Sequence, residues 1–423
     1  MSSTLTNWSG HHIYQATRVI TPNTLDELRH AVTQSRRLKV IGARHSFNHI
    51  ADSPDTLISL AHFDRVLALD RVKHTVTVGA GMSYGQLCQY LHEAGYALHN
   101  VASLPHITVA GACATATHGS GDGNGGLATA VLAFELMTAA GELVAMSPDT
   151  LGAAFYGAVV GLGALGVVTQ LTLRVQPSFE VQQVVYQDLP FAQLEAHFDA
   201  VMSHAYSVSL FTNWLENDIS QVWVKHRLEV GDAAHVFAPD WLGATLAGRK
   251  LHPIGHLPAD SCTEQLGARG PWHERLHHFK IAYTPSSGEE LQSEYFVARQ
   301  HAVAAIRALR ALAAHIAPVL QISEVRSIAA DDLWLSPCYQ QGSIGLHFTW
   351  QKDWAAVKQV LPMIEASLAP FNAKPHWGKL FTLPAPRLRA LYARMPEFVA
   401  LVQQFDPTGK LRNAFLDEMV FGA

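Results

Sequence analysis

Between Thr150 and Leu173 the chain carries no charged side chain, and this run limits the possible folds more than any other feature. Its length would suffice for a membrane-spanning helix. However, glycines interrupt it at positions 152, 157, 161, 163 and 166, and no cluster of Lys or Arg flanks it. Its end, VVTQLTLRV from residue 167, alternates like a strand. The run therefore predicts a buried helix, a turn and a strand.

The glycines at 161, 163 and 166 match the GxGxxG pattern of dinucleotide-binding Rossmann units. In such a unit the pattern follows a strand and opens a helix, because the helix N-terminus holds the pyrophosphate. Here helix-like residues precede the glycines and a strand-like segment follows them. We therefore expect a tight turn with a close contact between helix and strand, and not a Rossmann site.

The region before Pro177 has the pattern of an α+β unit. Thr24 and Glu27 predict a helix over 24–35 that begins with a capping box. Further elements are expected as strands at 38–41 and 75–78 and as a helix at 84–93. A long stretch rich in glycine, alanine, threonine and serine then follows at 102–126.

Beyond Pro177 aromatic residues, histidines and charged residues become frequent, which indicates a second domain. The segment 231–292 is expected to be rich in loops. The other expected elements are strands at 208–212 and 221–226 and helices near 299–315, 354–368 and 387–394.

Charge and cysteine content exclude several classes of protein. The 423 residues include 30 basic and 35 acidic side chains without long runs, so no nucleic-acid partner is expected. The four cysteines are too far apart in sequence for a metal clip or a CxxC motif, and no metal site is predicted. Buried thiols in a reducing compartment fit this pattern. The first residues lack the basic and apolar segments of a secretory signal, so a cytoplasmic location is expected.

Two loops have the composition of ligand-binding loops. The stretch 102–126, ASLPHITVAGACATATHGSGDGNGG, would let backbone N–H groups approach a ligand closely, and pyrophosphate oxygens are common ligands of such groups. A packed, loop-rich core element is the alternative. The segment GARHSFN at 42–48 places His45 on a loop after a short strand, where a structural histidine is the alternative.

Two short segments of the second half alternate polar and apolar residues. Glu324 and Arg326 are two residues apart, as are His347 and Thr349, so on strands each pair shares a face. This pattern describes a sheet whose polar side lines a cavity. A half-exposed sheet that faces solvent is the alternative. Lys379, beside Gly and Trp in the sequence PHWGK, is either a catalytic cation or a solvated lysine.

Taken together, these segments resemble the vanillyl-alcohol-oxidase/p-cresol-methylhydroxylase type of FAD oxidoreductases, and within it the bacterial alditol (xylitol/sorbitol) oxidases. The resemblance covers nearly the whole chain in the same order, and this collinearity makes it specific. The matching runs are GARHSFN at 42–48, TVGAGMSYGQL at 77–87, NVASLPHITVAGACATATHGSG at 100–121, GALGVVTQLTLRV at 163–175, CTEQLGARGPWHERLHHF at 262–279, SEVRSIAADDLWLSP at 323–337, HFTW at 347–350 and PHWGK at 375–379.

The resemblance implies an α+β fold, with a two-subdomain FAD-binding domain of the p-cresol-methylhydroxylase type and a cap domain whose antiparallel sheet covers the flavin. The changes in composition then place the FAD-binding domain at 1–176, the cap domain at 177–374 and a return to the FAD-binding domain at 375–423. The implied cofactor is FAD. The implied reaction oxidises the terminal primary hydroxyl of a polyol such as xylitol or sorbitol to the aldose and reduces O2 to H2O2. A monomer without membrane contact is expected.

The resemblance also assigns residues of the site. His45 matches the histidine that bonds covalently to the 8α-methyl group of the isoalloxazine. Further cofactor contacts are expected from Gly42, Arg44, Ser46, Ser103, Gly111, Thr115, Thr117, His118, Gly119, Gly166, Val168 and His376. The expected substrate-binding residues are Ser103, Glu324, Arg326, His347, Thr349 and Lys379.

Three of these residues are expected to be catalytic, because alcohol oxidation removes a hydride from carbon and a proton from oxygen. Arg326 and Lys379 would stabilise developing alkoxide charge. His347 would be the base because its ordinary pKa suits the task. Lys379 is the alternative base if burial beside Arg326 lowers its pKa. Glu324 would orient Arg326 or bind a substrate hydroxyl, and the small Ala102 would leave oxygen a path to the flavin.

Three other functions remain possible on sequence alone. A sugar-1,4-lactone oxidase or dehydrogenase would share the HSxN loop, the Glu-x-Arg strand and PHWGK, and would differ only in substrate. A carbohydrate-binding protein that has lost catalysis is less consistent with the intact His45, Arg326, His347 and Lys379. A membrane-bound, quinone-linked dehydrogenase would need a span or a basic amphipathic helix, and the sequence indicates neither.

Overall fold

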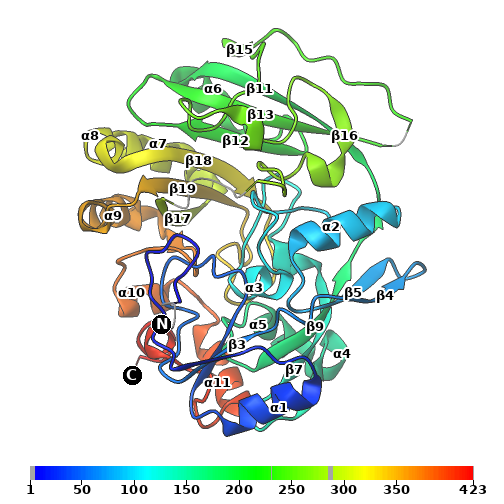
Figure 1. Ribbon diagram of the computed structural model, residues 1–423. Helices are drawn as coiled ribbons and strands as arrows, with labels where there is room; N and C mark the ends of the chain where they lie inside the picture. Colours follow the sequence, from blue (N-terminus) through cyan, green and yellow to red (C-terminus); the bar gives the residue numbers. More distant parts are fainter. Residues whose placement is uncertain (1–4, 230, 284–288, 423) are drawn as a thin grey trace.

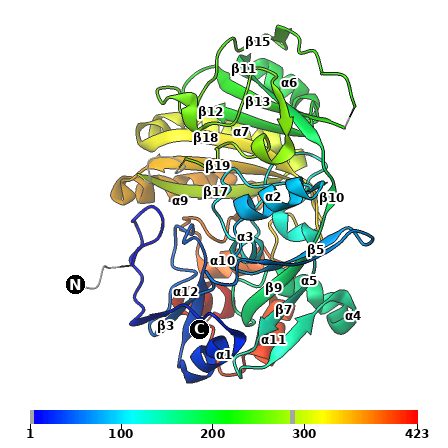
Figure 2. The same cartoon turned by 45° about the vertical axis from the view of Figure 1, so that its right-hand side comes forward.

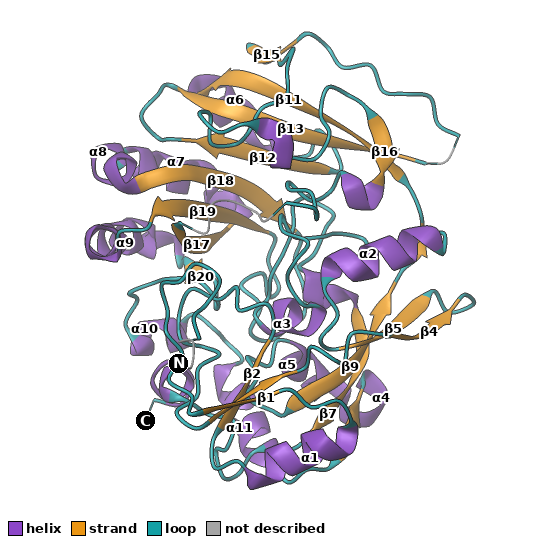
Figure 3. Cartoon of the chain, in the orientation of Figure 1, coloured by secondary structure: helices purple, strands orange, loops and turns teal. Residues whose placement is uncertain are grey.

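The structure is a computed structural model, and it describes residues 5–229, 231–283 and 289–422. Two bodies lie one above the other (Figure 1), and both ends of the chain lie in the lower one. A second view, turned by 45°, shows the same two layers (Figure 2). Figure 3 shows that the upper body is dominated by one wide sheet, whereas helices and smaller sheets alternate in the lower body.

In the described part of the chain, the lower body is built on two sheets of more than two strands. The first is parallel, with the order β1 (Arg18–Ile20), β3 (Thr56–Ser59), β2 (Leu38–Ile41). The second is antiparallel, with the order β4 (Val66–Asp70), β5 (Thr75–Gly79), β9 (Val167–Arg174), β7 (Val131–Met137), β8 (Leu143–Met146). The helices are α1 (Leu25–Gln34), α2 (Tyr84–Glu93), α3 (Val109–Ala114), α4 (Pro148–Leu151), α5 (Phe155–Val159), α10 (Ala385–Ala390), α11 (Met395–Phe405) and α12 (Ala414–Leu416).

The upper body is built on a sheet whose strand pairs are all antiparallel. Its order is β14 (Asp240–Trp241), β15 (Ala244–Leu246), β11 (Glu180–Pro190), β13 (Asp218–Leu228), β12 (Ser207–Thr212), β18 (Leu320–Ile328), β19 (Ser343–Gln351), β17 (Glu290–Ala298), β20 (Lys374–Pro375), and β16 (Arg269–Pro271) pairs with β11. Its helices are α6 (Phe191–Met202), α7 (Ala302–Arg310), α8 (Ala313–Ile316) and α9 (Trp354–Leu368). The apolar sides of these helices share one core with one face of the sheet, which leaves the other face for the lower body.

Two hydrophobic cores correspond to the two bodies, and the chain crosses between them repeatedly. Trp272 and Leu335 come from the middle of the sequence, yet they pack in the lower core. The pair β6 (Tyr96–Ala97) and β10 (Gln176–Pro177) lies just before β11, the first strand of the upper sheet along the chain. The glycine-rich stretch also meets the upper sheet, because Gly121 N–H donates to the carbonyl of Ser327 on β18 over 2.9 Å.

Several expected elements are confirmed with their boundaries. The strand at 38–41 and the helices at 84–93 and 354–368 have the predicted limits. Other elements differ by a few residues: the strands expected at 75–78, 208–212 and 221–226 are longer, and the helices near 299–315 and 387–394 are α7 with α8, and α10. The loop-rich segment ends before β17, whose first residue is Glu290.

The start of α1 differs from the predicted capping box. Thr24 Oγ accepts from the N–H of Glu27 over 3.2 Å, as expected. The Glu27 carboxylate, however, accepts from the N–H of Asn23 over 2.7 Å and not from the N–H of Thr24. Ser83 and Gln86 form a complete capping box at α2, where both reciprocal bonds are present. The reciprocal half of the expected box at α1 is therefore wrong.

The uncharged run folds as a buried helix, turn and strand, as predicted. Helix α5 leads into a turn in which Leu162 and Gly163 have positive φ angles of 51° and 63°. Strand β9 follows as the central strand of the antiparallel sheet. Gly166 lies against β7, where a Cβ would come within 2.6 Å of Leu136 Cδ1. The glycines therefore serve the turn and a close contact of the chain with β7.

Among the described residues no single helix is long and apolar enough to cross a membrane, although a bent pair, Arg299–Arg310 with Ala313–Val319, passes on length and composition.

Candidate active site

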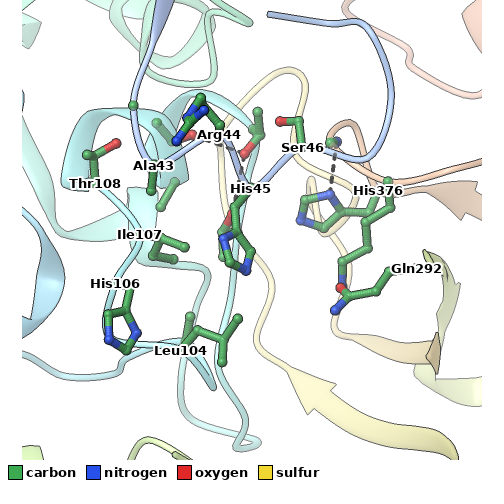
Figure 4. Close-up of a pocket in the computed structure, with 18 of the residues that line it drawn as sticks. Ala43, Arg44, His45, Ser46, Leu104, His106, Ile107, Thr108, Gln292 and His376 are labelled. Carbon is green, nitrogen blue, oxygen red and sulfur yellow. Dashed lines mark hydrogen bonds between the residues drawn. The ribbon is translucent and has the colours of Figure 1, made fainter. Parts of the chain in front are cut away.

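A cavity of about 510 Å³ lies between the two bodies. Loops of the lower body, including 42–46 and 102–118, form its floor, and strands β17, β18 and β19 form its roof. Pockets of several hundred Å³ with a few convergent polar groups are typical of cofactor and substrate sites. Figure 4 shows part of the lining, with residues of the 42–46 loop facing the 104–108 segment.

The cavity brings together all but one of the expected site residues. Those that line it are Gly42, Arg44, His45, Ser46, Ser103, Gly111, Thr115, Thr117, His118, Gly166, Val168, Glu324, Arg326, His347, Thr349, His376 and Lys379. Gly119 is the exception. A Cβ there would lie 2.2 Å from Asn100 Oδ1 and 2.4 Å from the Val101 carbonyl oxygen, so Gly119 is packed in the wall behind the cavity.

His45 is half-buried at the cavity wall, and both of its ring nitrogens are buried and unsatisfied. Neither Nδ1 nor Nε2 has a hydrogen-bond partner among the residues that the structure describes. Figure 4 shows its imidazole projecting from the loop into the pocket. Burial, followed by the charges of His106 and Lys379, lowers the pKa of His45 to about 3, so the ring is neutral at ordinary pH. Buried polar atoms without a partner are rare and indicate a missing ligand or a reactive group.

The N-terminal segment covers the loop that carries His45. The Trp8 ring centroid lies 4.4 Å from that of His45. The side-chain amide of Asn7 donates to the Ser46 carbonyl over 3.0 Å, and the Arg44 guanidinium donates to the Thr6 carbonyl over 2.9 Å. Arg44 therefore directs its charge toward this segment. Its backbone has a positive φ of 58°, a sparsely populated conformation for a residue with a side chain.

Two glycines lie close to Thr108: Gly42 brings the 42–46 loop against the 102–118 loop, and Gly111 belongs to the same loop as Thr108. A Cβ at Gly42 would lie 2.2 Å from Thr108 Oγ1, and a Cβ at Gly111 would lie 2.8 Å from the same atom. Only glycine fits at such distances without displacement of Thr108. The absence of these side chains leaves backbone surface facing the cavity, as a cradle for a ligand requires.

The roof places polar side chains toward the cavity at alternate positions of three adjacent strands. Glu324 on β18 is opposite His347 on β19, which in turn is opposite Glu294 on β17. The intervening Val325 and Leu346 pack in the upper core. The site side chains on this face are buried, so the alternative of a solvent-facing sheet is wrong.

One carboxylate joins the cationic groups of the site. Glu294 Oε2 lies 2.7 Å from Lys379 Nζ, and its Oε1 lies 3.3 Å from Arg326 Nη2 and 3.1 Å from His118 Nε2. Burial alone would raise the pKa of Glu294, but Lys379, His118 and Arg326 hold it well below its usual value. Glu294 was not predicted from the sequence, although Glu290, Gln292 and Glu294 occupy alternate positions of β17.

Glu324 contacts Arg326 less closely than expected. Its Oε1 lies 3.5 Å from Arg326 Nε but 2.7 Å from Nε2 of His278, which the sequence analysis did not single out. Arg326 Nη1 donates to Ser103 Oγ over 3.2 Å. Burial alone would raise the pKa of Glu324, whereas Arg326 and His278 lower it below the usual range. Glu324 is therefore a buried carboxylate, and Glu294 is the closer counter-ion of Arg326.

The two candidate bases differ in their surroundings. Burial, and then the charge of Lys379, lowers the pKa of His347 to about 3, so the expectation of an ordinary pKa is wrong. His347 Nε2 lies 3.1 Å from Gln292 Oε1, and Gln292 donates its amide to Glu290 over 2.6 Å. The Gln292 oxygen can only accept, so His347 carries its proton on Nε2 and Nδ1 is left as the acceptor. Burial also lowers the pKa of Lys379, and Glu294 opposes that shift.

The structure also places Ala102 and the four cysteines. Ala102 is buried at the cavity, and its carbonyl accepts from His277 Nδ1 over 2.6 Å. All four cysteines are buried and free. In the described ranges of the chain, no group of three or more His, Cys, Asp or Glu side chains is arranged to hold a metal ion.

Comparison with protein families gives two matches. Residues 16–147 match the family described as FAD binding domain, and residues 285–419 match the family described as D-arabinono-1,4-lactone oxidase. The first match contains the 42–46 and 102–118 loops, and the second contains the roof strands and Lys379.

Comparison with individual proteins extends over the whole chain. It is 46% identical over 425 residues to an alditol oxidase of a Streptomyces species, with 100% of both chains covered. It is 26% identical to L-gulonolactone oxidase of Mus musculus and 25% identical to L-gulono-1,4-lactone dehydrogenase of Mycobacterium tuberculosis, with 98% of both chains covered in each case. The crystal structure of cholesterol oxidase from B. sterolicum is similar with a TM-score of 0.77 over 99% of this chain and 96% of that chain, at 14% identity. This likeness confirms the expected α+β fold of the p-cresol-methylhydroxylase type.

Proposed function

The chain belongs to the alditol oxidase family of FAD-dependent oxidoreductases, and from this membership we propose that it oxidises the terminal primary hydroxyl of a polyol such as xylitol or sorbitol to the aldose, with reduction of O2 to H2O2. We further propose that it acts as a monomer in the cytoplasm, with a small polyol and oxygen as its partners. One observation supports this function above the others: a buried cluster of two cations, carboxylates and hydroxyls faces the same cavity as an unsatisfied histidine.

The residues of the floor fit FAD. His45 offers a neutral imidazole without a hydrogen-bond partner in the described residues, as covalent attachment would require. The close approach at Gly42 and Gly111 leaves backbone surface for the phosphates. We propose that His45 carries the flavin covalently. The residues that would line the rest of its site are Gly42, Arg44, Ser46, Ser103, Gly111, Thr115, Thr117, His118, Gly166, Val168 and His376.

When bound, the flavin supplies the acceptor for the hydride of the alcohol carbon and returns two electrons to oxygen. The protein residues supply position and charge. Arg326 and Lys379 would stabilise negative charge as the hydroxyl loses its proton. Glu294 on β17, which lines the same cavity, pairs with both cations and so keeps them in place.

Other side chains would bind the remaining hydroxyls of an open-chain polyol. Ser103, Glu324 and Thr349 all line the cavity, and together they can donate and accept hydrogen bonds. For the proton of the reacting hydroxyl we propose His347, whose Nδ1 is the accepting ring nitrogen, with Lys379 as the second candidate. The lowered pKa values keep each group neutral at a lower pH than in water, and a pKa of about 3 also makes His347 a weaker base than an ordinary histidine.

The proposal is tested on the purified protein with a flavin absorption spectrum and a substrate panel. We expect a yellow protein whose flavin remains in the precipitate after acid treatment. With a peroxide readout, xylitol and sorbitol should be oxidised with higher kcat/KM than glycerol or L-gulono-1,4-lactone. A colourless protein that stays inactive after addition of FAD would disprove the function.

The second candidate is a sugar-1,4-lactone oxidase or dehydrogenase, because residues 285–419 match the lactone oxidase family. Its substrate is a ring with fewer free hydroxyls, so it would make less use of Ser103, Glu324 and Thr349. The same panel separates the two functions. A preference for the lactone, or a reaction that proceeds only with a dye or quinone as acceptor, would favour this second candidate.

A further inference from the structure

We propose that Lys225 is a positioning residue which, through the tautomer of His278, holds the Glu324 carboxylate ready to accept a hydrogen bond from a substrate hydroxyl. Lys225 lies on β13 behind the roof and does not line the cavity. The inference rests on the proposed function, because that function assigns Glu324 to the substrate.

Lys225 is a buried lysine that directs its ammonium at three acceptors. Its side chain donates to the carbonyl oxygens of Leu276 and His277 and to Nδ1 of His278, the last over 3.1 Å. Only 1% of the residue is exposed. None of the ion pairs found among the described residues includes Lys225, so its protonated form is a buried charge without a carboxylate in contact. Such a charge is costly, and three well-placed acceptors are the compensation that the fold provides.

The third of these bonds fixes the proton of His278. An ammonium group can only donate, so Nδ1 of His278 must accept, and the single proton of the neutral ring is then on Nε2. Burial, and then the charge of Lys225, lowers the pKa of His278 to about 4, which keeps the ring neutral. Its Nε2 lies 2.7 Å from Glu324 Oε1. The arrangement therefore runs in one direction, with Lys225 donating to His278 and His278 donating to Glu324.

The hydrogen bond from His278 fixes the orientation of the Glu324 carboxylate. Its contacts with His278 and Arg326 both use Oε1. The other oxygen, Oε2, remains to accept from a hydroxyl in the cavity that Glu324 lines. If the His278 proton moved to Nδ1, the lone pair of Nε2 would face the carboxylate and repel it. Lys225 prevents this, because a proton on Nδ1 would face its ammonium group.

A purely structural role for Lys225 makes a different prediction. Its bonds to the Leu276 and His277 carbonyls also tie down the loop that covers Ser103, since His278 N–H donates to the Ser103 carbonyl over 3.2 Å. Loss of that support would lower stability and activity irrespective of the residue at 324. The proposed relay, in which Lys225 donates to His278 and His278 donates to Glu324, instead makes the effect of Lys225 depend on the chemical identity of residue 324. This dependence can be measured.

The test is a double-mutant cycle of Lys225→Met and Glu324→Gln in the full-length holoenzyme, with kcat and KM measured for xylitol. Assays at pH 6 keep Lys225 mostly charged, because burial lowers its pKa to about 7. Glu324 and Cys262 oppose that shift and Arg326 adds to it, while the His277 carbonyl and the His278 ring face the ammonium. We expect Lys225→Met to raise KM at least tenfold with a smaller change in kcat.

The double variant gives the decisive result. With methionine at 225, His278 can carry its proton on Nδ1, so the side-chain amide that Glu324→Gln introduces can donate to Nε2 and present its oxygen to the substrate. We expect kcat/KM of the double variant to exceed the product of the two single effects at least fivefold. Effects that multiply within twofold, or a KM of Lys225→Met within twofold of wild type, would overturn the relay. Lys374→Met is the matched control, because Lys374 is also buried, donates to the Pro337 carbonyl and does not line the cavity; its KM should be unchanged.

A measurement without turnover covers the case in which Lys225→Met does not fold. In wild-type protein labelled with ¹⁵N-histidine, the ring signals that disappear in His278→Gln should show the tautomer protonated on Nε2. A ring protonated on Nδ1 would overturn the inference. This measurement also separates the two proposals: wild-type protein that is inactive on every polyol contradicts the proposed function, while the tautomer of His278 still decides the relay.

Discussion

The ammonium of Lys379 lies 2.7 Å from Oε2 of Glu294, a carboxylate whose side chain has no exposed surface. The same carboxylate pairs with Arg326 through its other oxygen at 3.3 Å. One buried carboxylate therefore pairs with both cations that would face the substrate. Removal of either partner of a buried pair leaves an uncompensated charge, which costs far more than the pair contributes.

Glu294→Gln should therefore damage both stability and catalysis. We expect the free energy of unfolding to fall by about 3 to 5 kcal/mol. We expect kcat/KM for xylitol to fall by about 100-fold or more, because Lys379 and Arg326 lose the group that orders them. Denaturant unfolding and steady-state kinetics measure these quantities. Glu365→Gln is the control, since Glu365 is buried and accepts from Tyr295 and Thr382 but does not line the cavity; it should lose stability and keep kcat/KM within about twofold.

Lys379→Ala and Arg326→Ala test the cations themselves. Each should lower kcat/KM by about 100-fold or more, on the scale of about 2.7 to 4 kcal/mol for the loss of one preorganised donor. Flavin content measured by absorbance shows whether the cofactor site is intact in each variant. Lys358→Ala, at an exposed position of α9, should behave like wild type. Near-native kinetics in both site variants would show that the pocket has been assigned wrongly.

His45→Ala tests the covalent attachment. The variant lacks the proposed tether, so its flavin should appear in the supernatant after acid precipitation, whereas the wild-type flavin stays with the precipitate. His256→Ala, at an exposed position, should retain the wild-type pattern. Flavin that remains in the precipitate of His45→Ala would place the attachment at another residue.

The lowered pKa of His347 predicts how the rate depends on pH if His347 is the base. A base works in its deprotonated form, and a pKa of about 3 keeps His347 deprotonated well below the ordinary histidine value of 6.5. If His347 is the base, the rate of flavin reduction by xylitol under anaerobic conditions should not fall between pH 7 and pH 5. A loss of rate centred near pH 6.5 would contradict this. A loss that begins above neutral pH would instead identify Lys379 as the base, because its pKa is lowered from a value of 10.5.

Local sequence patterns predicted the parts of the site that depend on neighbours in the chain. The alternation around Glu324 and His347 is a property of single strands, so it identified a polar face without knowledge of the sheet order. Glu294 was not predicted as a site residue because its contacts depend on the strand order β18-β19-β17, which does not follow the order of the strands in the sequence. Strand β17 also begins at the end of a loop-rich tract, where no periodicity precedes it.

The other differences between the sequence-based predictions and the structure arise from the surroundings of a residue and not from its type. The expected pKa of His347 was that of an exposed ring, and burial next to Lys379 changes it. Gly119 belongs to the same glycine-rich stretch as Gly111 but turns toward Asn100, which only the path of the chain reveals. The division of the chain at 177 and 375 stays a prediction, since the lower core also includes Trp272 and Leu335.

The bond from Gly121 to Ser327 has a consequence for how the site is entered. It ties the strand that carries Arg326 to the floor, and Ala329 N–H donates to the Asn124 carbonyl over 3.0 Å just beyond it. Strand β20 joins β17 at the other margin of the roof. A hinge that swung the upper body away would have to break these backbone bonds in every turnover. These bonds therefore oppose a rigid-body opening of the roof and help the chamber to keep its geometry.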